Sequence, residues 1–247
     1  MNPRRCIISY ASFGREPYPL GLPRIIDSAK RNGHGWDFNN CFLILSPDYP
    51  GHEISGVSIN KMLPSYIDFP SHQKVPYGFK PWLFKIAFDL GLEQVLWCDS
   101  TIVIHKPLDR IWQIAEERGL FVGRNPGCPM RVWTSDDAMD QMGCPYKEPH
   151  EAMFDEIAAC ALAIDIRHET AKKVFKEWFT LCNDGVTFAG RGGSTRPDFR
   201  AHRHDQSAMS WLCQKYKVDY EPYGVLCYHS DIPKFPEHIL ANTGIGI

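Results

Sequence analysis

Short apolar runs alternate with amphipathic segments along this chain. The apolar runs predict buried strands, and they lie at residues 6–10, 41–45, 57–59, 95–98, 120–123 and 160–164. The amphipathic segments have apolar residues at three- and four-residue spacing, which predicts helices; they lie at residues 23–29, 80–90, 111–115, 135–142, 171–182 and 205–216. Alternation of this kind is typical of an α/β fold. The polar segments at 124–150, apart from its short helix, and 183–203 are expected to be loops.

Composition narrows the class of protein. The 27 basic and 29 acidic side chains nearly cancel, which argues against a protein held to nucleic acid by bulk charge. No apolar stretch is long enough for a transmembrane helix, and the nine cysteines include no Cys-x-x-Cys pair. We therefore expect reduced core thiols and a cytoplasmic location. The chain has no internal repeat and no clean linker, so residues 1–247 are expected to form one domain; its oligomeric state is open.

The strongest chemical signal lies at residues 95–104. The apolar run 95–98 ends in Asp99, and Thr101 follows two residues later. Open α/β sheets bind ligands beyond the carboxyl ends of their strands. A hard divalent ion on a diphosphate needs only one or two protein oxygens, and Asp99 and Thr101 can supply them. A turn capped by Asp99 explains the local sequence equally well.

Three segments in order resemble the GT-A-fold nucleotide-diphospho-sugar glycosyltransferases. They are the helix that begins near GFKPW at 78–82, the strand that ends in DST at 99–101, and HDQS at 204–207, which opens a late helix. The resemblance covers roughly residues 5–230. It implies a single, Rossmann-like αβα domain with a mixed, mostly parallel central sheet. Residues 1–105 would form a nucleotide-sugar-binding half, and residues 106–247 an acceptor-binding half.

The resemblance also implies a metal site for Mn²⁺ or Mg²⁺. In these enzymes an Asp-x-Asp motif holds the ion against the donor diphosphate. Asp99 matches the first Asp, whereas Thr101 stands where a second Asp is usual. A late His is often a further ligand, and His229 matches it; His202 and His204 are rival candidates.

Donor-binding residues are implied mostly in the first half of the chain. Tyr10, Ala11 and Ser12 match the strand end that cradles the nucleoside, where Tyr10 can stack on a base. Further donor contacts are expected from Arg15, Lys80, Ser100 and Gln206. Strand-end packing for Tyr10 and a solvated position for Lys80 are the structural alternatives.

Asp205 is the candidate catalytic residue, because these enzymes place an acidic residue at the start of the late helix. It can orient or deprotonate an acceptor hydroxyl, although a helix N-cap would also explain an Asp there. The preceding loop carries Arg191, Arg196, Arg200 and Arg203. These arginines are either solvated or a clamp for a diphosphate or an anionic acceptor.

The expected function is therefore a metal-dependent glycosyltransferase. It would move a sugar from a nucleoside-diphosphate sugar, a UDP-sugar by preference, to a hydroxyl of a carbohydrate or glycan acceptor. A non-catalytic nucleotide- or glycan-binding protein on the same fold is the main alternative, because Thr101 replaces an Asp. A nucleotidyltransferase is the other, although residues 10–15 have only one Gly and one Arg where such enzymes have a Gly-rich loop.

Overall fold

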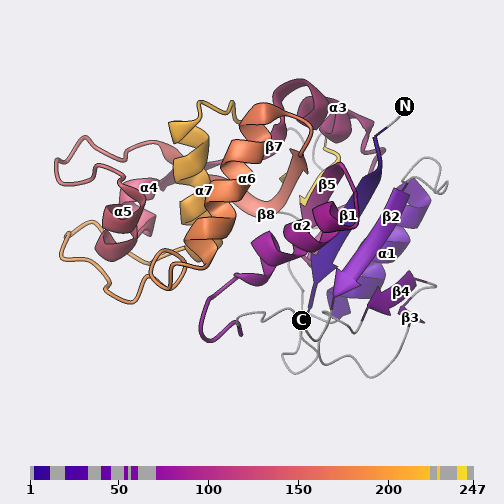
Figure 1. The fold of residues 1–247 in the computed structure, drawn as a ribbon, viewed down its shortest axis with the longest axis horizontal. Helices are drawn as coiled ribbons and strands as arrows, with labels where there is room; N and C mark the ends of the chain where they lie inside the picture. The colour runs from indigo at the N-terminus through magenta and orange to yellow at the C-terminus, as the bar shows by residue number, and fades with distance from the viewer. Residues whose placement is uncertain are drawn as a thin grey trace.

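A seven-stranded sheet forms the centre of the protein (Figure 1). The computed structural model describes residues 3–11, 20–32, 40–45, 53–54, 57–60, 71–222, 227–228 and 238–243. The strand order is β3-β4-β2-β1-β5-β8-β7. The strands are β1 (Arg5–Tyr10), β2 (Asn40–Leu45), β3 (Glu53–Ile54), β4 (Val57–Asn60), β5 (Gln94–Cys98), β7 (Leu120–Pro129) and β8 (Asp155–Asp165).

The sheet is mixed. Strands β4, β2, β1 and β5 are parallel neighbours, while β8 runs antiparallel between β5 and β7. Strand β5 is buried along its whole length, as its uninterrupted apolar run predicts. These findings confirm the α/β class and the mixed sheet.

Helices cover both faces of the sheet. The helices are α1 (Gly21–Asn32), α2 (Phe79–Asp89), α3 (Asp109–Arg118), α4 (Met130–Trp133), α5 (Asp136–Met142), α6 (Glu169–Cys182) and α7 (His204–Lys215). Because side chains alternate along a strand, Val95 and Trp97 join a core with α2, α6 and α7, whereas Leu96 and Cys98 join a core with α1 and α3. The two cores make an αβα sandwich.

A second, three-stranded sheet lies beside the first. It has the order β6-β10-β9, formed by β6 (Ile102–Ile104), β10 (Leu240–Asn242) and β9 (Cys227–Tyr228). Strand β10 pairs antiparallel with β6, which sets Asn242 opposite Ile102. The C-terminal segment therefore meets the chain just after Asp99.

Several boundaries differ from the sequence prediction. Strands β7 and β8 are longer than the apolar runs at 120–123 and 160–164, because residues of the predicted loop pair with residues ahead of the second run, Arg124 with Ile157 and Pro129 with Asp155. The loop at 183–203 is confirmed as free of helix and strand, but it is not simply exposed, since Thr187 and Phe188 are buried.

Two compositional expectations can be compared with the structure. The seven cysteines whose side chains are described are all free thiols, and six of them are buried. Within the described residues, no helix is long and apolar enough to cross a membrane.

Candidate active site

The topology places a crevice at the carboxyl ends of β1 and β5. Strand β1 lies between β2 and β5, and both are parallel to it, so the chain order reverses at this point. Such a switch point is where open α/β sheets bind ligands. Asp99 directly follows β5, and Ala11 directly follows β1.

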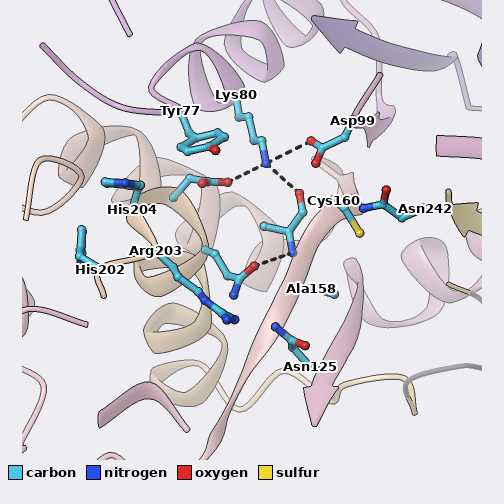
Figure 2. A pocket seen from close by; sticks show the side chains of 13 residues that line it. Tyr77, Lys80, Asp99, Asn125, Ala158, Cys160, His202, Arg203, His204 and Asn242 are labelled. Carbon is cyan, nitrogen blue, oxygen red and sulfur yellow. Dashed lines mark hydrogen bonds and ion pairs between the residues drawn. The ribbon is translucent and has the colours of Figure 1, made fainter. Parts of the chain in front are cut away.

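A cavity of about 390 Å³ opens beside Asp99 (Figure 2). Its walls come from the start of α2 and the loop before it, the end of β5, β7, the middle of β8, the start of α7 and β10. The lining residues are Tyr77, Lys80, Asp99, Asn125, Ala158, Ala159, Cys160, His202, Arg203, His204, Asp205, Gln206 and Asn242. The cavity thus brings together residues from both halves of the chain.

Lys80 is the centre of the polar network on the cavity wall. Its ammonium lies 2.9 Å from Asp205 Oδ2 and 3.4 Å from Asp99 Oδ1, and it donates a 2.9 Å hydrogen bond to the carbonyl of Ala159. The rings of Tyr77 and Trp97 flank it at 5.3 and 5.2 Å. Lys80 is only 2% exposed, so the alternative of a solvated lysine at the helix start is wrong.

Charge and burial act together on this network. Burial alone lowers the pKa of Lys80, but the carboxylates of Asp205 and Asp99 outweigh burial and hold that pKa above its ordinary value. Burial raises the pKa of Asp205, and the ammonium of Lys80 offsets part of that rise. Lys80 therefore stays charged, and the Asp205 carboxylate holds a proton more readily than an ordinary aspartate.

Asp99 is the accessible carboxylate of the pair. The indole Nε1 of Trp97 donates a 2.7 Å hydrogen bond to its Oδ1, and its backbone N–H donates to the carbonyl of Cys160 on β8. The side chain is 31% exposed. Among the described residues, none bonds to Oδ2, which leaves that oxygen for a ligand.

One carboxylate oxygen is compatible with a divalent ion that takes its other ligands from a diphosphate and water. Asp99 fits this minimal role, and Asn242 brings an amide to the same cavity. Thr101 does not line the cavity; its carbonyl accepts hydrogen bonds from Thr243. Within the described part of the chain, no three His, Cys, Asp or Glu side chains gather in a metal-binding group.

Asp205 enters the cavity from the first turn of α7. The N-cap position belongs to Arg203, and no side chain of the described residues caps this helix. The alternative in which Asp205 is only a cap is therefore wrong, since its carboxylate faces Lys80 instead. His204, next to it, has a φ of +52°, and its ring stacks on that of Tyr77, which has a φ of +58°. Two strained residues side by side at a cavity are typical of a functional site.

Gln206 connects the cavity to a buried carboxyl group. Its Oε1 accepts from the backbone N–H of Ala159 at 3.4 Å, and its Nε2 donates to Glu156 Oε2 at 2.8 Å. Glu156 is fully buried, and burial raises its pKa to about 7 despite opposing hydrogen bonds from Gln206 and Ser207. The amide of Gln206 is thus held in one orientation.

Three of the predicted donor-binding residues, Tyr10, Ala11 and Ser100, lie outside the cavity. Tyr10 stacks on Phe79, with ring centroids 4.2 Å apart, and Ala11 is buried. Ser100 is also buried, with its carbonyl so close to Gly21 that a Cβ there would lie 2.0 Å from it. These three residues do not line the cavity. Ser12, Arg15 and His229 lie outside the described residues.

Sequence reasoning missed several residues of the site. Tyr77, Asn125 and Asn242 line the cavity, and Glu156 accepts a hydrogen bond from the lining residue Gln206. The three lining residues sit in segments without a periodic pattern, and Glu156 begins an apolar strand where no neighbour in sequence signals its partners. Only three-dimensional pairing reveals them.

Comparisons with models of known protein families and with curated proteins find no match. The function must therefore be inferred from the site itself.

Proposed function

We propose that this protein is a metal-dependent glycosyltransferase of the GT-A type that uses a nucleoside-diphosphate sugar, by preference a UDP-sugar. The observation that carries the proposal is the pairing of Asp99 and Asp205 through Lys80 across one cavity at the switch point of the sheet. An acidic group at the strand end and another at the late helix are the two carboxylates that such a transferase needs on its donor and acceptor sides.

On the donor side, the Asp99 carboxylate would hold the diphosphate through Mn²⁺ or Mg²⁺. The bound ion would neutralise the negative charge that develops on the departing diphosphate. The Lys80 ammonium pairs with Asp99 Oδ1, and the Trp97 indole donates a hydrogen bond to the same oxygen, so the carboxylate is held in one orientation. Asp99 Oδ2 is then directed to the ligand.

On the acceptor side, Asp205 would orient or deprotonate the attacking hydroxyl. Its raised pKa makes it a stronger base than an ordinary aspartate. In-line deprotonation would invert the anomeric centre, whereas positioning the hydroxyl on the leaving-group face would retain its configuration. Gln206, held by Ala159 and Glu156, borders the same space.

A panel of sugar nucleotides tests the proposal. The melting temperature is measured with UDP-, GDP- and ADP-sugars, each with and without Mn²⁺. A ligand at 100 times its Kd stabilises the native state by about 2.7 kcal/mol, so a specific donor should give a clear rise that needs Mn²⁺. If none of the donors raises the melting temperature of the wild-type protein, the proposal is contradicted.

One observation favours a second candidate, a non-catalytic nucleotide- or glycan-binding protein. Thr101 stands where the family has an Asp and does not line the cavity, and Asp99 already has the Lys80 ammonium as a cationic partner. Titration of Mn²⁺ with and without UDP in a calorimeter separates the two. Binding of UDP that is indifferent to Mn²⁺, with no transfer, would favour the binding protein.

A further inference from the structure

Arg203 presents a fixed guanidinium to the end of the cavity away from Asp99 (Figure 2). The group lies on the ring of Trp133, 3.8 Å from its centroid. Its Nη1 lies 3.7 Å from Glu156 Oε2, too far for a hydrogen bond. Stacking on an aromatic ring fixes the plane of an arginine without using its N–H donors.

The donors of Arg203 have little else to bind. Within the described residues, its guanidinium makes no hydrogen bond, and its side chain is 28% exposed. Arg196 of the same loop differs, because its side chain is bound to Asp136, Ser194 and two carbonyls. Asn125, which borders the same end of the cavity, likewise makes no side-chain hydrogen bond to a described residue. The end of the cavity is thus lined by unused donors.

This end is remote from the expected diphosphate. Asp99 is tied to Cys160 on β8, and Arg203 is paired with Glu156 on the same strand. Those two strand residues are four apart, and a strand rises about 3.3 Å per residue, so they are separated by about 13 Å. That span exceeds one sugar ring. Asp99 and Arg203 are thus anchored farther apart along β8 than the length of a diphosphate.

We propose that Arg203, on Trp133 and beside Asn125, binds an anionic group of the acceptor, a carboxylate or a phosphate. A planar guanidinium with open donors matches the two oxygens of either group. This inference rests on the proposed function only in identifying the bound molecule as the acceptor. The anion site itself does not depend on transfer. The acceptor would then be an acidic or phosphorylated sugar and not a neutral one.

Matched monosaccharides test the proposal. The Kd values of methyl glucuronide and of glucose 6-phosphate are measured by NMR titration against neutral methyl glucoside, at fixed ionic strength with saturating UDP and Mn²⁺. Wild-type protein should bind at least one charged sugar about 10- to 100-fold more tightly than the neutral one, as for a charge-assisted pair. The carboxylate and phosphate arms show which anion the site takes.

Variants of two neighbouring arginines assign the effect. Arg203→Gln should abolish the preference for the charged sugar and leave the Kd of UDP unchanged. Arg200→Gln is the matched control, because Arg200 is exposed, lies 5.8 Å from the same Trp133 ring and does not line the cavity. Arg203→Lys keeps the charge without the planar fork and should retain part of the preference, which gives a second readout if Arg203→Gln folds poorly.

The outcomes separate this inference from the proposed function. Equal binding of charged and neutral sugars to wild type, or a preference that survives in Arg203→Gln, would overturn the anion site. If UDP does not bind in the presence of Mn²⁺, the sugar titrations are repeated without UDP and Mn²⁺. An Arg203-dependent preference would then support the anion site while the transferase proposal fails.

Discussion

The ammonium of Lys80 lies 2.9 Å from the carboxylate of Asp205, and both side chains are almost completely buried. Breaking a buried pair on one side leaves an uncompensated charge, which costs about 3–5 kcal/mol. The pair also holds Asp99, so the geometry of both candidate carboxylates depends on one lysine. The free-energy cost of burying two charged groups, Lys80 and Asp205, is concentrated at the crevice where ligands are expected.

Lys80→Met should therefore lower the free energy of unfolding by about 3–5 kcal/mol, because it leaves Asp205 buried beside Asp99 without a cation. Urea denaturation measures this change. Lys85→Met is the matched control on the same helix: the Lys85 side chain is 40% exposed and, among the described residues, pairs only with Asp89. An exposed pair of this spacing contributes about 0.3–0.5 kcal/mol. Equal losses in the two variants would show that the Lys80 network does not stabilise the site.

Glu156 should make stability depend on pH. Its pKa is raised from 4.5 to about 7 in the folded protein. Between these values the unfolded chain releases a proton that the folded protein keeps, so the free energy of unfolding falls as pH rises from about 4.5 to 7. At 1.36 kcal/mol per pKa unit, the loss is about 3 kcal/mol.

Glu156→Gln should remove that dependence. Ser207 Oγ lies within hydrogen-bond distance of both the Trp133 carbonyl and Glu156 Oε1, but its one proton can serve only one of them. A protonated Glu156, or a Gln, can donate to Ser207 and still accept from Gln206. Stability curves from pH 5 to 8 should stay flatter in this variant than in wild type and in Glu117→Gln, an exposed control. Parallel curves for all three would contradict the raised pKa.

Asp205→Asn should separate acceptor chemistry from donor binding. Lys80 keeps Asp99 and the Ala159 carbonyl as partners, so folding should survive. Transfer should fall by about 10²- to 10⁴-fold, as for a lost general base, while the Kd of UDP stays near wild type. Single-turnover rates and calorimetry give the two quantities. A variant that loses UDP binding but keeps its acceptor affinity would place Asp205 on the donor side.

Arg196 should act as the anchor of the loop at 183–203. Its side chain is largely buried and bonds to Asp136, Ser194 and the carbonyls of Arg131 and Thr134. Arg196→Gln is expected to cost about 3 kcal/mol and to increase proteolysis of the loop. Arg191 is exposed and donates a 3.4 Å hydrogen bond to the Lys74 carbonyl. Arg191→Gln should therefore change neither the stability nor the proteolysis of the loop. Unaltered proteolysis in Arg196→Gln would argue against an anchored loop.

Local patterns predicted most of the elements and some of the site. Leu83, Ala87 and Gly91 were enough to locate α2, because apolar spacing and a left-handed residue after the helix are encoded within one segment. Asp99 could be placed at a strand end for the same reason. The direction of β8 and the partners of Glu156 could not, since both depend on pairing between segments far apart in sequence.

The role of Lys80 shows the same limit. A lysine in the first turn of an amphipathic helix is ordinarily solvated, and nothing near it in sequence indicates two carboxylate partners. Asp99 and Asp205 become its neighbours only when β5 and α7 pack beside α2. Burial of a charge is a property of the assembled sheet and helices.

The most direct test of the proposed function is the binding of UDP to wild-type protein and to Asp99→Asn, measured by calorimetry with and without Mn²⁺. Asn keeps an oxygen for the Trp97 hydrogen bond but lacks the charge that a diphosphate-bound ion needs. Asp89→Asn, an exposed substitution on α2, is the control. We predict Mn²⁺-dependent UDP binding in wild type and in the control, and its loss in Asp99→Asn with little change in melting temperature. Equal, Mn²⁺-independent binding in all three proteins, or no binding to wild type, would contradict the proposed function.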